Sequence, residues 1–281
     1  MSTLPEKTAV YGGGRMGAGI AHALLVSGSS VSIVEADATG AEAARERVAV
    51  SIGRAADRGL LTDEPGAVLD RLAVTTDPAV LGAAALVVEA VPEDVGLKAK
   101  VLSIIEQAAP EADLATNTSS LSVDGLASGL RRPERFIGLH FFNPVPASDL
   151  VEIVVGSATA SDLVEQAQGW VASLGKTGIT VTDSPGFASS RLGVFIALEA
   201  IRMVEDGVAS AEDIDTAMTL GYKHPTGPLR TTDIVGLDVR LAIAEHLERE
   251  LGPRFAPPQL LRDKVAAGTL GRKTGEGFFT W

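Results

Sequence analysis

The stretch Thr8-Ala-Val-Tyr-Gly-Gly-Gly-Arg-Met-Gly17 decides the fold class of this chain. It begins as a short apolar run typical of a strand, and Gly12, Gly14 and Gly17 then follow the spacing G-x-G-x-x-G. An amphipathic pattern over residues 16–27 predicts a helix directly afterwards. A strand, a glycine turn and a helix in this order indicate a dinucleotide site. Gly12 would make the tight turn, Gly14 would face the pyrophosphate and Gly17 would allow close packing of the helix.

The start of the predicted helix, at Arg15 and Met16, is the expected site of the cofactor phosphates. Unpaired N–H groups and the helix dipole favour anions there. Glu35 ends a second strand-like run, eighteen residues after Gly17. A carboxylate in this place accepts hydrogen bonds from ribose hydroxyls and repels a 2′-phosphate. We therefore predict that the cofactor is NAD rather than NADP.

The first 180 residues alternate short apolar runs with longer helical patterns, which predicts βαβ units and a mainly parallel, Rossmann-type sheet. Strands are predicted over residues 8–11, 31–35, 72–75, 86–89, 114–116, 136–140, 151–155 and 179–181. Helices are predicted over residues 16–27, 39–58, 97–108 and 161–174. The helix at 39–58 is long and rich in charges, so we expect a long helical hairpin insertion that projects from the sheet.

The pattern changes after residue 183. Helical patterns cover residues 187–206, 211–220, 239–251 and 258–267, without a convincing strand among them. The first of these is apolar on most faces, which predicts burial in a helical domain or against another subunit. We therefore expect two domains, an NAD-binding domain over residues 1–183 and an all-α domain over residues 184–281.

Composition excludes several classes of function. The chain has 281 residues, of which 46% are hydrophobic and 21% charged, as in a soluble globular protein. Its net charge of −12 argues against a nucleic-acid partner. The absence of Cys excludes disulfides and cysteine-bound metals, and we predict no metal site. The chain shows neither a signal segment nor an apolar run long enough to span a bilayer, so a cytoplasmic protein without a membrane partner is expected.

Two polar segments follow predicted strands. Residues 89–94 read Glu-Ala-Val-Pro-Glu-Asp, and residues 117–120 read Asn-Thr-Ser-Ser. Ligands of open α/β sheets bind outside the carboxyl ends of the strands. Both segments are therefore expected to line the cofactor crevice, with Glu93 and Asn117 among the lining residues.

A candidate catalytic pair follows in Gly138-Leu-His-Phe-Phe-Asn-Pro-Val-Pro146 and the later Glu152. If their strands are neighbours, Glu152 faces His140 and fixes which imidazole nitrogen carries the proton, as a general base requires. The alternative is that His140 is a hydrogen-bonded core histidine and Glu152 an ordinary strand residue. The pair alone does not decide between these readings.

With these residues in view, the chain resembles the L-3-hydroxyacyl-CoA dehydrogenase family, including bacterial 3-hydroxybutyryl-CoA dehydrogenases. The resemblance covers nearly the whole length. Besides the glycine motif, it rests on strings that begin at Glu89, Asn117, His140, Asp183 (D-S-P-G-F), His224 (H-P-T-G-P), Asp233 (D-I-V-G-L-D) and Leu270 (L-G-R-K-T-G).

The resemblance implies an NAD-dependent oxidoreductase of fatty acid metabolism. Such an enzyme interconverts a (3S)-3-hydroxyacyl-CoA and the 3-oxoacyl-CoA, here with a short acyl chain. The resemblance also implies a homodimer formed through the helical C-terminal domain, and a helical hairpin that helps to hold CoA.

The family pattern assigns roles to particular residues. His140 would exchange the proton of the 3-hydroxyl group, and Glu152 would orient it. Ser119 would hydrogen-bond the reacting oxygen, and Asn143 would position the substrate. Three further positions match ligand contacts of the family: Glu93 and Lys98 for the cofactor and Arg58 for CoA.

Two positions depart from the family pattern. Ser190 stands where the family usually has Asn after the Pro-Gly-Phe string, and Asp149 stands where a cation is common. A serine hydroxyl lacks the two-ended geometry of an amide, so the identity of the substrate stays open at this stage. The alternatives are the same chemistry on a carrier-protein-bound or atypical hydroxyacyl thioester and, more remotely, a non-catalytic NAD-binding protein. The acyl chain length, the physiological direction and the pathway are not readable from the sequence.

Overall fold

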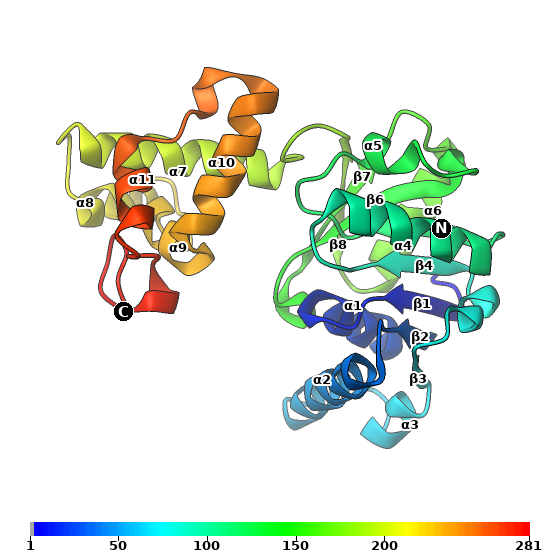
Figure 1. The fold of residues 1–281 in the computed structure, drawn as a ribbon. Coiled ribbons are helices and arrows are strands. Elements are labelled where there is room, and N and C mark those ends of the chain that lie inside the picture. Colours follow the sequence, from blue (N-terminus) through cyan, green and yellow to red (C-terminus); the bar gives the residue numbers. More distant parts are fainter. Residues whose placement is uncertain (1–2) are drawn as a thin grey trace. The chain divides into compact units, whose positions relative to one another are not determined.

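The computed structural model describes residues 3–281, which divide into two compact units (Figure 1). The N-terminal unit ends at Ser184, and the C-terminal unit is Pro185–Trp281. Within the described residues, no helix is both long enough and apolar enough to cross a membrane.

The N-terminal unit is built on one eight-stranded sheet with the order β3-β2-β1-β4-β5-β6-β7-β8. The strands are β1 (Lys7–Tyr11), β2 (Ser30–Val34), β3 (Leu72–Thr75), β4 (Leu86–Glu89), β5 (Asp113–Thr116), β6 (Phe136–Phe141), β7 (Leu150–Val155) and β8 (Thr177–Thr182). Neighbours are parallel except β6 and β7, which are antiparallel. All eight predicted strands are present, and the predicted mainly parallel sheet is confirmed. The strand order reverses between β1 and β4, where such sheets bind their ligands.

Helices cover both faces of this sheet (Figure 1). They are α1 (Arg15–Val26), α2 (Ala38–Asp57), α3 (Pro65–Leu69), α4 (Val95–Ala108), α5 (Val123–Ala127) and α6 (Ser161–Ser173). Short 3₁₀ turns lie at η1 (Pro78–Ala83), η2 (Pro133–Arg135) and η3 (Val145–Ala147). Apolar side chains of α1, α2 and α6 share one core with one face of the sheet. The short α5 packs on the opposite face, where Val123 meets Gly138 of β6.

The alternation of side chains along β6 and β7 sends the polar residues to the face that α5 covers. Leu139 of β6 and Ile153 of β7 belong to the core shared with α1 and α6. Because successive side chains of a strand point to opposite faces, His140 and Glu152 face the other side. The two strands pair in a register that sets His140 directly opposite Glu152. The condition under which the sequence set Glu152 against His140, that their strands are neighbours, is therefore met.

The predicted helix at 39–58 is present as α2, and the hairpin lies closer to the sheet than expected. The helix α2 does not stand free, because Ala44, Val48 and Ile52 are fully buried in the sheet core. Its return arm is only the five-residue α3. The chain between them reads Arg-Gly-Leu-Leu-Thr-Asp-Glu over residues 58–64, and Gly59 with a φ of +67° ends the helical path.

The C-terminal unit is helical, as predicted. It consists of α7 (Ser189–Glu205), α8 (Ala211–Thr216), α9 (Pro228–Val235), α10 (Leu237–Leu251) and α11 (Gln259–Ala266). A π-helical turn η4 (Ala217–Gly221) and 3₁₀ turns η5 (Pro253–Phe255) and η6 (Arg272–Thr274) complete it. Val194, Leu198 and Ile201 of α7 lie at its core, whereas Leu192 and Phe195 of the same helix are exposed.

Two buried carboxylates hold this unit together. Asp215 accepts hydrogen bonds from the backbone N–H groups of Leu229 and Arg230, at the start of α9. Asp233 of α9, which is 1% exposed, accepts bonds from the backbone of Phe278 and from the indole of Trp281. The end of the chain is thereby tied to the middle of the unit.

Candidate active site

The glycine loop has the geometry that a dinucleotide requires. Gly12 has a φ of +97°, and a Cβ there would lie 2.9 Å from the carbonyl oxygen of Ala90. A Cβ at Gly17 would lie 1.7 Å from the oxygen of Gly12, so α1 packs closely on the turn. A Cβ at Gly14 would meet nothing within 4 Å, which leaves the start of α1 open to a ligand. Gly12 and Gly17 thus allow a close-packed turn, and Gly14 leaves space at the start of α1.

Glu35 lies directly after β2, at the edge of a pocket of about 720 Å³. Its Oε1 accepts a 2.5 Å hydrogen bond from the N–H of Gly13, which fixes the carboxylate beside the glycine loop. Arg47 of α2 donates a 3.2 Å bond to the oxygen of Gly13 and also lines the pocket. The cavity and the carboxylate together fit the adenosine half of NAD.

A second pocket of about 510 Å³ brings most of the predicted site residues together. It is lined by Gly14, Arg15, Met16, Ala90, Val91, Pro92, Glu93, Asn117, Ser119, His140, Phe141, Phe142 and Asn143. These residues come from the start of α1, from the segments that follow β4 and β5, and from the end of β6 with the segment after it. We refer to this cavity below as the catalytic pocket.

His140 and Glu152 form a close buried pair. The Nδ1 atom of His140 lies 2.7 Å from Oε2 of Glu152, with side chains that are 8% and 0% exposed. A carboxylate at this distance holds the proton on Nδ1, which leaves Nε2 as the basic nitrogen. The ring of Phe142 packs against the imidazole at 4.5 Å between centroids. The arrangement is that of an oriented general acid–base.

Two side chains fix the end of β6 and the turn that follows it. Asn117, after β5, accepts a 2.9 Å bond at its Oδ1 from the N–H of Phe141. Lys176 donates to the carbonyl oxygens of Val145 and Ser148, in the turn that follows Asn143. Burial lowers the pKa of Lys176, and the nearby Asp149 acts in the opposite direction.

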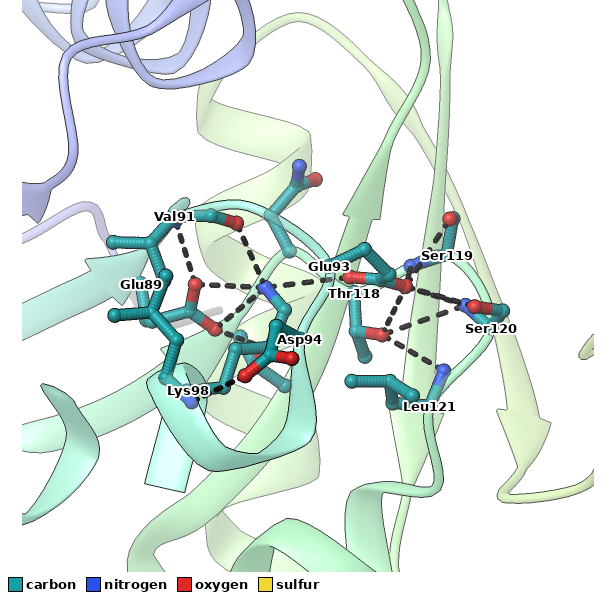
Figure 2. Close-up of polar contacts among 12 residues, drawn as sticks. Glu89, Val91, Glu93, Asp94, Lys98, Thr118, Ser119, Ser120 and Leu121 are labelled. Atoms are coloured by element: carbon teal, nitrogen blue, oxygen red, sulfur yellow. Dashed lines mark hydrogen bonds and ion pairs between the residues drawn. The ribbon is translucent and has the colours of Figure 1, made fainter. Parts of the chain in front are cut away.

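Glu93 holds the segment that carries Ser119 (Figure 2). Its Oε1 accepts bonds from the hydroxyl of Thr118 and from both the N–H and the hydroxyl of Ser119 and Ser120. Burial alone would raise the pKa of the Glu93 carboxyl, but these bonds and the charge of Lys98 outweigh it, and the pKa lies below its ordinary value. Glu93 is therefore ionised at neutral pH.

Glu89 does not line the crevice, contrary to the expectation from the sequence. Its side chain is fully buried and accepts two bonds from Nζ of Lys98, at 2.7 and 3.0 Å. The N–H of Val91 and the hydroxyl of Thr116 complete its partners. Lys98 is itself only 1% exposed and does not line the catalytic pocket, but its ammonium group lies 3.4 Å from the carboxylate of Glu93, which does (Figure 2).

Comparison with known proteins agrees with this geometry. The profile of the 3-hydroxyacyl-CoA dehydrogenase NAD binding domain matches residues 7–184, and that of the C-terminal domain of the same enzymes matches residues 186–281. The chain belongs to the 3-hydroxyacyl-CoA dehydrogenase family. Its N-terminal unit is the NAD-binding domain of that family, so the protein is an NAD-dependent dehydrogenase and NAD is its cofactor.

Individual relatives cover the whole chain. A probable 3-hydroxybutyryl-CoA dehydrogenase of Deinococcus radiodurans is 41% identical over 98% of this chain and 100% of the relative. A 3-hydroxybutyryl-CoA dehydrogenase of Mycobacterium tuberculosis is 39% identical over the full length of both. The crystal structure of the (S)-3-hydroxybutyryl-CoA dehydrogenase of Ralstonia eutropha superposes with a TM-score of 0.94 at 39% identity, covering 98% of this chain and 99% of that one.

One residue that the family pattern assigned lies outside both pockets in the N-terminal unit of this dehydrogenase. Arg58 follows the end of α2, is exposed, and lines neither pocket. Ser190 lies in the first turn of α7, in the C-terminal unit. His22 is buried in α1, and its Nδ1 lies 3.0 Å from the hydroxyl of Ser51. Among residues 3–281, no group of three His, Asp or Glu side chains is arranged to hold a metal ion.

Proposed function

We propose that the protein interconverts a short-chain (3S)-3-hydroxyacyl-CoA and the corresponding 3-oxoacyl-CoA with NAD. The observation that carries the proposal is the buried His140–Glu152 pair, because His140 lines the same pocket as Gly14, at the open end of the glycine loop. A base next to a nicotinamide site is what the oxidation of a secondary alcohol needs, since a proton and a hydride leave together. The relatives named 3-hydroxybutyryl-CoA dehydrogenase support a short acyl chain.

In this proposal His140 takes the proton from the 3-hydroxyl group at Nε2 and returns it in the reverse direction. Glu152 keeps Nδ1 protonated and stabilises the imidazolium that forms. The pair is closed off from solvent on the Glu152 side, so the proton moves only toward the catalytic pocket. Positioned proton transfer of this kind is typically worth about 10²–10⁴-fold in rate.

Ser119 and Asn143 are proposed to bind the substrate in the same pocket. The hydroxyl of Ser119 donates to Glu93 at 3.3 Å, a long bond that it can exchange for one to the reacting oxygen. Asn143 is exposed at the pocket and has an amide that can donate and accept at once. The two side chains would fix the thioester with its C3 atom facing the cofactor.

NAD supplies the hydride acceptor when it is bound. The proposed cofactor contacts are the backbone of the glycine loop, Arg15 and Met16 for the diphosphate, and Glu35 for the ribose. Glu93 and Asn117 line the catalytic pocket and are proposed to lie beside the nicotinamide. Lys98 is assigned a role through Glu93, because its ammonium group is buried.

We also propose a homodimer formed by the C-terminal unit. Large apolar side chains of this unit are exposed, including Leu192 (63%), Leu220 (67%) and Tyr222 (77%). Covering such side chains favours association. We place the reaction in the fatty acid metabolism of the cytoplasm and assign Arg58 to the CoA moiety, in keeping with the family pattern.

The test is oxidation of NADH by acetoacetyl-CoA, by the matching carrier-protein thioester and by free acetoacetate. The wild type is expected to use the CoA thioester, and His140→Ala is expected to lose at least about 10²-fold. If the protein turns over only the carrier-protein thioester, its substrate is a carrier-bound thioester and not an acyl-CoA. Absence of turnover with every thioester would refute it.

Ser190→Asn tests the departure from the family pattern in the same assay. Restoring the amide is expected to raise kcat/KM for acetoacetyl-CoA by about five- to tenfold, the value of one hydrogen bond, and to leave the affinity for NADH unchanged. An unchanged kcat/KM would mean that Ser190 does not shape substrate preference.

A further inference from the structure

The residues Glu89, Lys98 and Glu93 form a connected group of charges, which we call the charge hub (Figure 2). Glu89 and Lys98 are joined by two bonds of 2.7 and 3.0 Å, and both are buried to 1% exposure or less. Lys98 lies farther from Glu93, at 3.4 Å. The closer carboxylate therefore neutralises the ammonium group, and the hub as a whole keeps one negative charge.

The net negative charge of the hub lies on the carboxylate of Glu93, at the wall of the catalytic pocket. Glu93 lines that pocket, and its side chain is 33% exposed, whereas Glu89 and Lys98 are hidden behind it. Its Oε1 accepts the bonds from Ser119 and Ser120, which favour the ionised form. The pocket thus contains a fixed anion that the protein has left without a full counter-charge.

The nicotinamide ring must lie in this pocket, because hydride transfer places it beside the carbon whose oxygen exchanges a proton with His140. The ring is a cation when oxidised and neutral when reduced. A fixed negative charge nearby attracts the first form and not the second. Arg15 also lines the pocket, but it lies at the start of α1, where the diphosphate binds, and the diphosphate has the same charge in both forms.

We propose that Glu89 sets the redox preference of the cofactor site: by neutralising Lys98, it leaves Glu93 free to favour NAD⁺ over NADH. Glu89 touches neither ligand in this account and acts only through the charge of the hub. The proposal rests on the proposed function only in placing the nicotinamide ring beside His140.

The experiment measures the dissociation constants of NAD⁺ and NADH separately, by calorimetry and by NADH fluorescence, without any thioester. In Glu89→Gln the hub becomes neutral, since Lys98 now compensates Glu93. Binding of NAD⁺ is expected to weaken about tenfold relative to NADH, the order expected for one partly screened charge several ångströms away. Equal weakening of both forms would indicate a structural role and overturn the proposal.

A charge-restoring control separates electrostatics from packing. The double variant Glu89→Gln/Lys98→Met again leaves one negative charge on Glu93, and its NAD⁺/NADH preference is expected to return to that of the wild type. Thr116→Val removes the 2.6 Å bond to Glu89 without changing any charge, and is expected to keep the wild-type preference. A double variant that stays as impaired as the single one would contradict the proposal.

Glu93→Gln provides an independent route if the buried substitution prevents folding, which circular dichroism would show. Its side chain is partly exposed, and its loss also makes the hub neutral. The same relative weakening of NAD⁺ is expected, and an unchanged preference would overturn the proposal. Turnover of acetoacetyl-CoA by the wild type, measured alongside, reports on the proposed function separately from this inference.

Discussion

Removal of the carboxylate charge beside His140 is the perturbation whose effect the structure predicts most directly. In Glu152→Gln the shape of the side chain is kept, but the amide carries no charge. The wild-type bond of 2.7 Å joins two side chains that are 8% and 0% exposed, so solvent cannot replace it. The amide can also donate to Nδ1, which would move the ring proton to Nε2, the atom that must accept the substrate proton.

The size of the effect follows from the type of bond. A hydrogen bond to a charged group contributes about 1.5–3 kcal/mol, and each 1.4 kcal/mol is a factor of ten in rate. The bond strengthens only when His140 becomes charged, so its loss acts on the transition state rather than on substrate binding. We therefore expect kcat to fall by about 10- to 150-fold, with little change in the KM for NADH.

The assay is steady-state oxidation of NADH with acetoacetyl-CoA, together with a thermal melt of each variant. Glu111→Gln is the matched control, because that side chain is 96% exposed and far from any proposed role. A folded Glu152→Gln variant with the wild-type kcat would refute the reasoning. A change confined to the KM for NADH would do so as well.

Three further predictions concern other parts of the chain. Arg240 of α10 is 6% exposed, its Nε atom lacks a hydrogen bond, and no ion pair is found for it among residues 3–281. Burial lowers its pKa to about 10, which means that burying the charged guanidinium group costs free energy. Arg240→Met removes this cost and is expected to raise the free energy of unfolding by about 1–3 kcal/mol in denaturant unfolding. A lower free energy of unfolding would contradict this. Glu35→Ala is expected to weaken the binding of NADH about tenfold and to reduce the preference of the protein for NADH over NADPH. If the wild type binds NADH and NADPH equally well, the role assigned to Glu35 is wrong. Ionised Glu93 stabilises the fold above its ordinary pKa of 4.5, and this contribution is lost as the pH falls through the lowered pKa. The difference in the free energy of unfolding between the wild type and Glu93→Gln, measured in urea, should therefore shrink as the pH falls from about 5 to about 3. A constant difference would show that Glu93 does not stabilise the fold in its ionised form.

The sheet was predictable because its signals are local. Short β-branched runs alternate with amphipathic helices, and each strand side chain has only two directions to choose from. The same alternation placed His140 and Glu152 on one face once their strands were known to be neighbours. The spacing of Gly12 and Gly17 is local as well, and the contact that requires Gly17 comes from Gly12 itself, whereas the contact that requires Gly12 comes from Ala90, in a distant segment.

Other features depend on contacts between distant segments. The helix α9 was not predicted, because its first N–H groups are capped by Asp215 from α8 rather than by a neighbouring side chain. Residues 217–221 continue α8 as a π turn where the sequence suggested one regular helix. The close packing of α2 on the sheet likewise depends on β2 and β3 and is not visible in the charge pattern of the helix.

The charge hub illustrates the same limit within the site. Its segment was recognised as polar, and Glu93 does line the catalytic pocket. The sequence could not show that Glu89 points into the protein and binds Lys98 with Thr116, since that depends on the parallel pairing of β4 with β5. The residues that line the pocket were easier to predict than the buried residues that set its charge environment.

The central claim, hydride transfer to C3 of a 3-oxoacyl thioester, is tested most directly with an isotope. The protein is incubated with acetoacetyl-CoA and NADH that carries two deuterium atoms at C4 of the nicotinamide, and the product is analysed by mass spectrometry. We predict one deuterium atom at C3 of 3-hydroxybutyryl-CoA in the wild type, and no labelled product in His140→Ala on the same time scale. Consumption of NADH without deuterium at C3, or labelled product at the wild-type rate in His140→Ala, would contradict the account.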